Sequence, residues 1–376
     1  MLAFWLNLLS PPFLALWSSN PSDAELTPSM ICLNSKTLEH LADCLEGFIP
    51  ARGLYDRASY NAGQPDTSQR AAWSSIVSSL LDVDGSCSSI QVPPPLGRTI
   101  RWLTADRHVF RKGWGAMIVP ERRVAVSRTI HISAPNPEFD VGTPSQAAYL
   151  FKATGTKSFL MAGRTRTAFL HPSPCISVTS QSGYYETDPA HNNREPFFDA
   201  SLAIHTWQQR RGCPSSTCHS PTSKAWYLDS SDRPVKRLKG HLQLTIPAWS
   251  VSLPPDSSCV LTATRNVVGR YINGVPEHSV CQAGANPTEA LGEFVHIEQD
   301  DLSRGAGSYE MWAGAIRRTF ETSCAEGMSV DPDTGLCAFS RPRTVAYDPA
   351  FDSAIPALSQ SARAQWLLWL SLLNVL

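Results

Sequence analysis

The 376-residue sequence has few charged side chains and lacks the signatures of several common enzyme classes. Charged residues make up 17% of the chain, the formal net charge is -1 at pH 7, and no long basic run occurs. This pattern argues against nucleic acid as the main partner. No GxSxG, HExxH, Walker or dinucleotide-binding fingerprint occurs either. The sequence therefore gives no support to a serine hydrolase, a zincin protease or a nucleotide-binding enzyme.

The sequence also lacks any Cys-x-x-Cys pair and any acceptor sequon for N-glycosylation, yet it contains ten cysteines. An even number of cysteines and a loop-rich chain with 29 prolines are typical of a secreted, disulfide-bonded protein. Spacing alone does not determine connectivity. One arrangement has the local pairs Cys32–Cys44, Cys213–Cys218, Cys259–Cys281 and Cys324–Cys337, with Cys87 and Cys175 left as a long-range pair.

Both ends of the chain carry apolar segments that have the layout of processing signals. Residues 1–17 are strongly apolar and predict a signal peptide within residues 1–20, although this segment lacks the Lys or Arg that usually marks the start of such a signal. Small residues near Ser353, a spacer and the apolar residues 366–376 have the layout of a signal for a lipid (GPI) anchor. A terminal amphipathic helix docked on the core is the alternative. We therefore expect a secreted or cell-surface protein, with membrane attachment if the anchor signal is used.

The chain between these ends divides into two parts. Residues 21–119 read as an N-terminal elaboration with helices over residues 35–45 and 68–83, and residues 120–350 read as an α/β core. The core begins with a strand, a short helix and a second strand over residues 128–162, which predicts a parallel βαβ unit. Thr143 to Gln146 has the spacing of a capping box at the start of that helix, and Gly155 is placed to end it.

Further strands and helices complete the predicted core. Short apolar or alternating runs predict strands at residues 116–119, 241–246, 260–264 and 292–298. Helical spacing predicts helices at residues 197–208 and 309–320. The expected fold class is α/β: a three-layer sandwich with a mostly parallel central sheet and an N-terminal helical elaboration.

Polar residues follow the predicted strands, where α/β proteins place their chemistry. Glu138 and Asp140 follow the first strand of the βαβ unit, and Arg164 and Arg166 follow the second. His296 and Glu298 are two residues apart and would share one face of a strand. Each has a plain structural alternative: the arginines could be solvated or pair with Asp140, an Asp before a helix often makes an Asx turn, and Glu298 could pair with Arg304 or Arg318.

Three motifs together resemble one group of enzymes. PNPEFDVGT (135–143) resembles a PHPxxDxxT pattern of secreted fungal and bacterial proteins related to zinc-dependent hydrolases. MAGRTRTA (161–168) with DPAHN (188–192) is the second motif, and GRYINGVPEHSVC with GEFVHIEQD, between Gly269 and Arg304, is the third. The third motif resembles the ending of N-formylglutamate amidohydrolase-like enzymes, a branch of the zinc carboxypeptidase-type fold. Together the motifs span roughly residues 120–320.

The resemblance implies that a bound zinc ion polarises an amide carbonyl and its attacking water. Glu298 would be the general base, and Arg164 and Arg166 would hold the carboxylate of a small peptide or amide substrate. The weaker candidates for metal ligands are Glu138, Asp140, His191 and His296.

This sequence departs from the family pattern at two ligand positions. Asn136 stands where the pattern has His, and Thr245 stands near the place of a second expected His. A neutral amide is a poor zinc ligand. The chain is therefore expected to be either a metallohydrolase with another ligand set, drawn from His131, His191 and His296, or a relative with a degenerate site that acts as a non-catalytic surface protein.

Overall fold

The computed structural model describes residues 32, 34–85, 112–176, 183–211, 224–256, 263–286, 290, 292, 294–339 and 366–371. The described helices are α3 (Leu38–Glu46), α4 (Arg57–Gly63), α5 (Thr67–Leu81), α7 (Thr143–Thr154), α8 (Pro196–Arg210), α9 (Lys224–Leu228), α10 (Pro234–Thr245), α11 (Val267–Ile272) and α12 (Tyr309–Thr319). The described strands are β1 (Gly115–Pro120), β2 (Arg128–Ala134), β3 (Thr156–Met161), β4 (Met328–Val330), β5 (Cys337–Phe339) and β6 (Trp366–Ser371). Short 3-10 turns occur at Arg123–Ala125, Glu277–Ser279 and Ala306–Ser308.

The larger sheet has the strand order β2-β3-β1-β6. β2 and β3 are parallel and are connected by α7, which confirms the predicted βαβ unit. β1 is antiparallel to both β3 and β6, so one of the three described pairings in this sheet is parallel. The fold is α/β, as predicted, but the described sheet is mixed where a mostly parallel sheet was expected.

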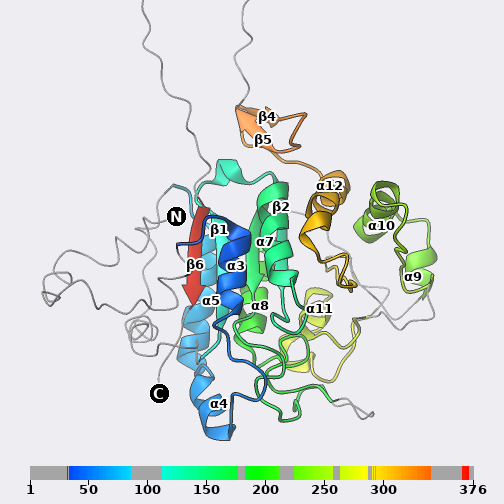
Figure 1. The fold of residues 1–376 in the computed structure, drawn as a ribbon. Coiled ribbons are helices and arrows are strands. Elements are labelled where there is room, and N and C mark those ends of the chain that lie inside the picture. Colours follow the sequence, from blue (N-terminus) through cyan, green and yellow to red (C-terminus); the bar gives the residue numbers. More distant parts are fainter. Residues whose placement is uncertain are drawn as a thin grey trace, which may run out of the picture.

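Different helices cover the two faces of this sheet. On one face, α3 and α7 pack against Ala116, Ile118 and Phe159. On the other face, α5 and α8 pack against Met117 and Val119. Alternate side chains of β1 thus belong to different cores, as the two-residue period of a strand requires. Figure 1 shows α3 and α7 side by side, with the β4–β5 hairpin projecting at one end of the molecule. A third core joins α10 and α12 to Ile130 of β2 and Leu150 of α7.

The start of β1 and the exit of β3 cross backbone against backbone. A Cβ atom on Gly163 would lie 2.2 Å from the Gly115 nitrogen and 2.6 Å from the Gly113 carbonyl carbon. Gly113 and Gly115 also have positive φ angles of 57° and 129°, which side chains disfavour. This crossing fixes the direction in which residues 164–166 leave the sheet.

Several local predictions are confirmed and one is wrong at the start of α7. The two N-terminal helices are present as α3 and α5, and Gly155 ends α7 in the left-handed conformation. The predicted capping box at Thr143 does not form. Gly142 is the N-cap residue, with a φ of 84° and no capping side chain. Thr143 is already inside the helix, and its Oγ1 donates to the carbonyl of Asp140 at 2.7 Å.

Two predicted strands are absent. Residues 241–245 form the end of α10 and Ile246 is its C-cap residue, and Leu238 and Leu242 are buried one helical turn apart. Residues 294–298 have no strand partner in the described chain, although their sequence alternates. The predicted strand at 260–264 lies mostly outside the described residues, and residues 263 and 264 are not in a strand.

Three disulfides are described. Cys32–Cys44 and Cys324–Cys337 are as predicted. Cys281 pairs with Cys175 and not with Cys259, and this bond spans 106 residues. The remaining cysteines (Cys87, Cys213, Cys218 and Cys259) lie outside the described residues. Disulfides are compatible with a secreted protein.

The predicted processing signals fall largely outside the described residues, at 1–31, 340–365 and 372–376. The segment Trp366–Ser371 is described, and it forms strand β6 beside β1 where an anchor signal or a docked helix was expected. None of the helices in the described ranges is both long enough and apolar enough to span a bilayer.

Candidate functional site

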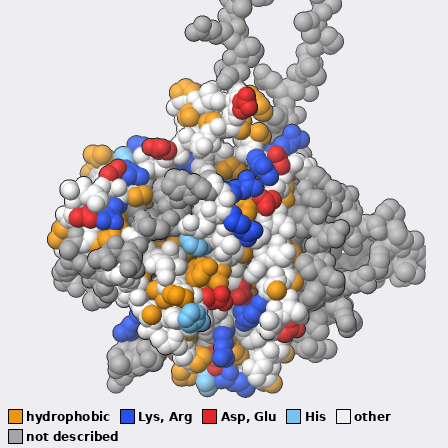
Figure 2. Space-filling model, turned by 180° about the vertical axis from the view of Figure 1, so that it is seen from behind, with side chains coloured by type: hydrophobic (Ala, Val, Ile, Leu, Met, Phe, Trp, Pro, Cys, Tyr) orange, Lys and Arg blue, Asp and Glu red, His pale blue; other side chains and the backbone are white. Residues whose placement is uncertain are grey.

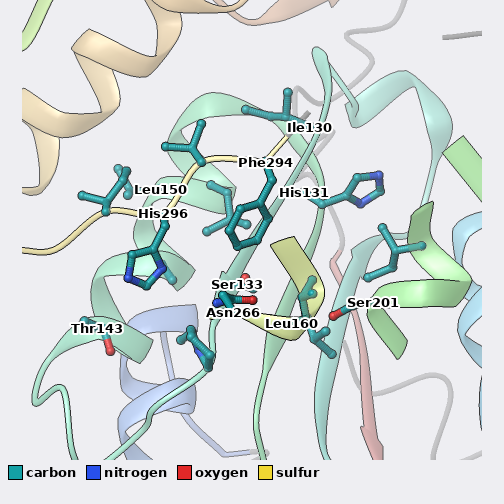
Figure 3. A pocket seen from close by; sticks show the side chains of 18 of the residues that line it. Ile130, His131, Ser133, Thr143, Leu150, Leu160, Ser201, Asn266, Phe294 and His296 are labelled. Atoms are coloured by element: carbon teal, nitrogen blue, oxygen red, sulfur yellow. The ribbon is translucent and has the colours of Figure 1, made fainter. Parts of the chain in front are cut away.

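A cavity of about 300 Å³ lies beside β2, which is an edge strand of the described sheet. Its walls come from β2, α7, α8, α11, the end of α12 and the segment Phe294–Gln299. Most of the walls are apolar, and polar side chains collect where β2 ends. Figure 3 shows Phe294 reaching into the middle of the cavity, with His296 to its left and Ser133 and Asn266 below.

His296 and Glu298, which the sequence paired on one strand face, are hydrogen-bonded in the wall of this cavity. His296 Nε2 and Glu298 Oε1 are 2.7 Å apart. This hydrogen bond lowers the pKa of Glu298, and the charges of His296, Arg166 and Arg304 add to the effect against the opposing effect of burial. Glu298 is therefore a carboxylate at neutral pH, beside an imidazole that it can orient. The two residues meet although residues 296–298 have no strand partner in the described chain.

Arg166 and His191 meet at a buried carboxylate that the sequence had not singled out. Asp188 is fully buried, and it pairs with the guanidinium of Arg166 and, at 3.0 Å, with His191 Nδ1. Burial raises the pKa of Asp188, but the opposite effect of His191 and Arg166 is larger in sum. The net pKa of Asp188 is therefore below the usual value. Burial also lowers the pKa of His191, and the nearby charge of His296 acts in the same direction.

Arg164 does not face the cavity. Its side chain is 1% exposed and forms two hydrogen bonds with Glu195, at 2.7 and 2.9 Å. The role of Arg164 as a substrate anchor stays a prediction that this geometry does not favour, because its guanidinium is buried and hydrogen-bonded to Glu195. Arg166 is one-fifth exposed and is held by Asp188, so it is available only in part.

The two acidic residues after β2 have different environments. Asp140 lines the cavity and accepts a hydrogen bond from Asn136 Nδ2 at 3.0 Å. Asn136 is 6% exposed, and its Oδ1 has no hydrogen-bond partner among the described residues. Glu138 is exposed with a positive φ of 63°, and its backbone N–H donates to Glu46. Glu138 is absent from the cavity wall.

The described residues do not fit a zinc ion. In the part of the chain that the structure describes, no three His, Cys, Asp or Glu side chains are grouped closely enough to hold a metal. His131, one of the alternative ligands, is engaged with Ser158 at 2.7 Å and with Gln208 at 3.2 Å. Burial lowers the pKa of His131 to about 4, so its imidazole is neutral. Thr245 ends α10 and accepts from Arg318, outside the cavity wall.

Sequence reasoning missed Asp188, Glu195 and Gln208. Asp188 and Glu195 belong to a loop. Neither spacing nor periodicity in the sequence predicts that they form ion pairs with Arg166 and Arg164, which follow β3. Gln208 Nε2 donates to the carbonyl of Thr129 at 3.2 Å, which places it on the open edge of β2. The charge of Asp188 within the DPAHN motif was the one available signal.

Comparison with known family models, with curated proteins and with solved structures found no match for this chain. The resemblance to zinc carboxypeptidase-type enzymes therefore stays a prediction.

Proposed function

We propose that the chain is a secreted hydrolase-like protein that cleaves a small amide or peptide in the cavity beside β2, with His296 and Glu298 as its acid–base pair. The observation that carries this proposal is the 2.7 Å contact between His296 Nε2 and Glu298 Oε1 in the cavity wall. A histidine held by a carboxylate is a common arrangement for general acid–base catalysis.

The chemistry follows from the charges of the pair. Glu298 has a lowered pKa and accepts the Nε2–H of His296. The other ring nitrogen, Nδ1, is then an acceptor that can take a proton from water as the water oxygen attacks the amide carbonyl. The protonated imidazole returns that proton to the leaving amine when the C–N bond breaks. Glu298 thus holds His296 in position for this proton transfer, where the family resemblance made Glu298 itself the base.

No step of this proposal uses a metal, because the described donor set does not fit zinc. A metal-dependent version would need further ligands. We therefore expect hydrolysis to continue after dialysis against a chelator, and zinc well below one equivalent by elemental analysis. Loss of activity with the chelator and its return with zinc would overturn the metal-free mechanism.

The direct test compares initial rates of hydrolysis of short peptide amides by the wild-type protein and three variants. We expect His296→Asn and Glu298→Gln each to lower kcat by roughly 10²- to 10⁴-fold. His171→Asn is a matched control, because His171 Nδ1 lies 2.7 Å from Glu186 Oε1, away from the cavity wall. This control should stay within about twofold of wild type. Equal rates in all four proteins would show that the His296–Glu298 pair does not catalyse the reaction.

A non-catalytic binding protein is the second candidate. It is favoured by the predominantly apolar walls and by the engagement of both candidate anchors, Arg164 with Glu195 and Arg166 with Asp188. Binding of peptides without any hydrolysis, in the presence or absence of zinc, would support this candidate.

The cellular location and the finer fold class belong to the same proposal. Secretion is supported by the three disulfides and by the predicted signal peptide. Attachment to a membrane through a C-terminal lipid anchor rests on the sequence layout alone. A three-layer α/β arrangement is supported by the burial of α3 and α7 against one face of the sheet and of α5 and α8 against the other.

A further inference from the structure

Two residues of β2 direct main-chain groups toward the cavity. Ala162 N–H donates to the Ala134 carbonyl at 3.1 Å, so Ala134 faces β3. Alternate residues of a strand in a ladder turn their N–H and C=O groups to the same neighbour. His131 and Ser133 therefore turn theirs to the open edge. Among the described residues, none outside the sheet hydrogen-bonds to these main-chain groups.

The free stretch of edge is short. Toward the start of β2, the carbonyl of Thr129 is already occupied by Gln208 Nε2 at 3.2 Å. The strand ends at Ala134, where Asn136 and Asp140 close the cavity. The edge from His131 to Ser133 can pair with about three to four residues of an extended chain, because each residue of a strand adds about 3.3 Å.

The cavity has apolar walls on both sides of the sheet plane. Phe197 and Ile204 of α8 line one side, and Leu150 of α7 and Ile316 of α12 line the other. Successive side chains of a strand point to opposite faces. An added strand would therefore place its alternate side chains against two apolar surfaces. The face of the molecule seen in Figure 2 carries hydrophobic side chains gathered next to histidine and acidic side chains.

The polar end of the cavity has hydrogen-bond acceptors that a donor on the ligand could satisfy. The amide nitrogen of Asn136 is bound to Asp140, so Oδ1 is turned away as an acceptor, and it is buried without a described partner. The Asp140 and Glu298 carboxylates line the same cavity. Unpaired acceptors and carboxylates favour a positively charged donor and disfavour a ligand carboxylate.

We propose that the cavity binds the N-terminal segment of an extended apolar peptide, which adds to the edge of β2 as a short antiparallel strand with its ammonium group at Asn136 and Asp140. The direction follows from the geometry, because Asn136 lies beyond the carboxyl end of β2. Strand addition is an established mode of peptide recognition, in which main-chain bonds give affinity and the side-chain pockets give specificity. The inference rests on the proposed function only in naming the substrate of the same cavity.

The test is calorimetric titration of the wild-type protein with the tetrapeptide amide Leu-Val-Leu-Val-NH2, with mass spectrometry to show that the peptide stays intact. His296→Asn replaces wild type if the peptide is cleaved. The same peptide is also methylated on the backbone nitrogen of its second or third residue. Every second N–H of an antiparallel strand faces its neighbour. We expect one of the two methylations to weaken binding at least tenfold and the other to change it less than threefold.

Two further comparisons test the two ends of the site. Ser133→Pro removes an edge N–H that β3 does not use, and proline is tolerated in edge strands. We expect this variant to bind at least tenfold more weakly, and Ser133→Ala to bind within twofold of wild type. The N-acetylated peptide, which lacks the ammonium, should also bind at least tenfold more weakly.

Absence of binding, or equal effects of the two methylations, would overturn the strand-addition inference. Unchanged binding of the acetylated peptide would overturn the placement of the ammonium. If Ser133→Pro fails to fold by circular dichroism, the methylation series on the wild-type protein still decides. If one methylation weakens binding and the other does not, and no peptide is hydrolysed, the proposed catalysis is overturned and the strand-addition inference is supported.

Discussion

Arg164 and Glu195 form a two-bonded ion pair, with Nε to Oε2 at 2.7 Å and Nη2 to Oε1 at 2.9 Å, and neither side chain is more than 3% exposed. The pair joins the exit of β3 to the residue before α8. Burial lowers the pKa of Arg164, but the charge of Glu195, the nearby Tyr55 and Tyr60 and the hydrogen bonds to Glu195 together outweigh burial. The net pKa is therefore above the usual value, and the arginine stays charged. A residue that the sequence placed in the substrate site is thus part of the core.

Removal of one partner of this pair should damage stability and not substrate affinity. Arg164→Met leaves the Glu195 carboxylate buried without its partner, which typically costs about 3–5 kcal/mol of unfolding free energy. The double variant Arg164→Met, Glu195→Met should recover most of this loss. Urea denaturation measures both. Arg211→Met is the control, because the Arg211–Asp82 pair is 40% and 49% exposed and should contribute less than about 1 kcal/mol. A stable Arg164→Met variant with a raised KM would restore the anchoring role.

The disulfide Cys175–Cys281 should be the largest covalent contributor to stability among the three described. It closes a loop of 106 residues, whereas Cys324–Cys337 closes 13. Chain-entropy arguments give about 4.7 kcal/mol for a loop of 100 residues and about 3 kcal/mol for one of 15. We expect Cys175→Ser with Cys281→Ser to lower the melting temperature more than Cys324→Ser with Cys337→Ser, in differential scanning calorimetry. The reverse order would show that native-state strain and not loop length governs these bonds.

Asp199 should make stability depend on pH near neutrality. Burial raises its pKa to about 7, with further repulsion from Glu277 and Glu195 and an opposing attraction from Arg70. The folded state therefore holds a proton that the unfolded state, with a pKa near 3.8, has released. The stabilisation is full below pH 4 and is lost as pH rises toward 7, by up to about 1.4 kcal/mol per pH unit.

Asp199→Asn should flatten this dependence between pH 4 and 7, because an amide does not titrate. Unfolding free energies from urea titrations at several pH values measure the slope for both proteins. A mutant slope equal to the wild-type slope would exclude Asp199 as its source.

Gly163 should tolerate no side chain. In Gly163→Ala the new Cβ would meet backbone atoms of Gly115 and Gly113, which cannot move as a flexible side chain can. We expect a loss of at least about 3 kcal/mol in unfolding free energy, or no folded protein. Gly240→Ala is the matched control, since nothing lies within 4 Å of its Cβ position in α10 and alanine is the better helix former. That control should gain about 0.5–1 kcal/mol, and a folded, unaltered Gly163→Ala would show that the crossing can relax.

The local parts of this fold are predictable from sequence because their signals are local. The helix α5 shows helical spacing of Trp73, Ile76 and Leu80, and all three are buried. The unit β2–α7–β3 is predictable from the apolar, alternating sequences of its strands and from Gly155, which ends the helix. The end of α10 was misread as a strand because HLQLTI alternates. This helix is stabilised by packing against α12, which lies far along the chain. Such a long-range contact cannot be inferred from six residues of sequence.

The candidate site was predictable only in part. His296 and Glu298 meet as expected from their spacing of two residues, although they do not lie in a strand. The partners of Arg164 and Arg166 lie 31 and 22 residues further along the chain, and no spacing rule specifies which carboxylate a basic residue will meet. Cys281 shows the same limit, because connectivity is set by the fold and not by spacing.

The open edge of β2 is short, which limits pairing between copies of the chain. A long, bare edge strand is a template on which copies of one chain can pair and grow into fibres. Here Gln208 occupies one end, Asn136 and Asp140 close the other, and the segment Phe294–Gln299 walls the cavity between them. An edge that admits only a few residues can hold a short peptide while a neighbouring sheet is kept out.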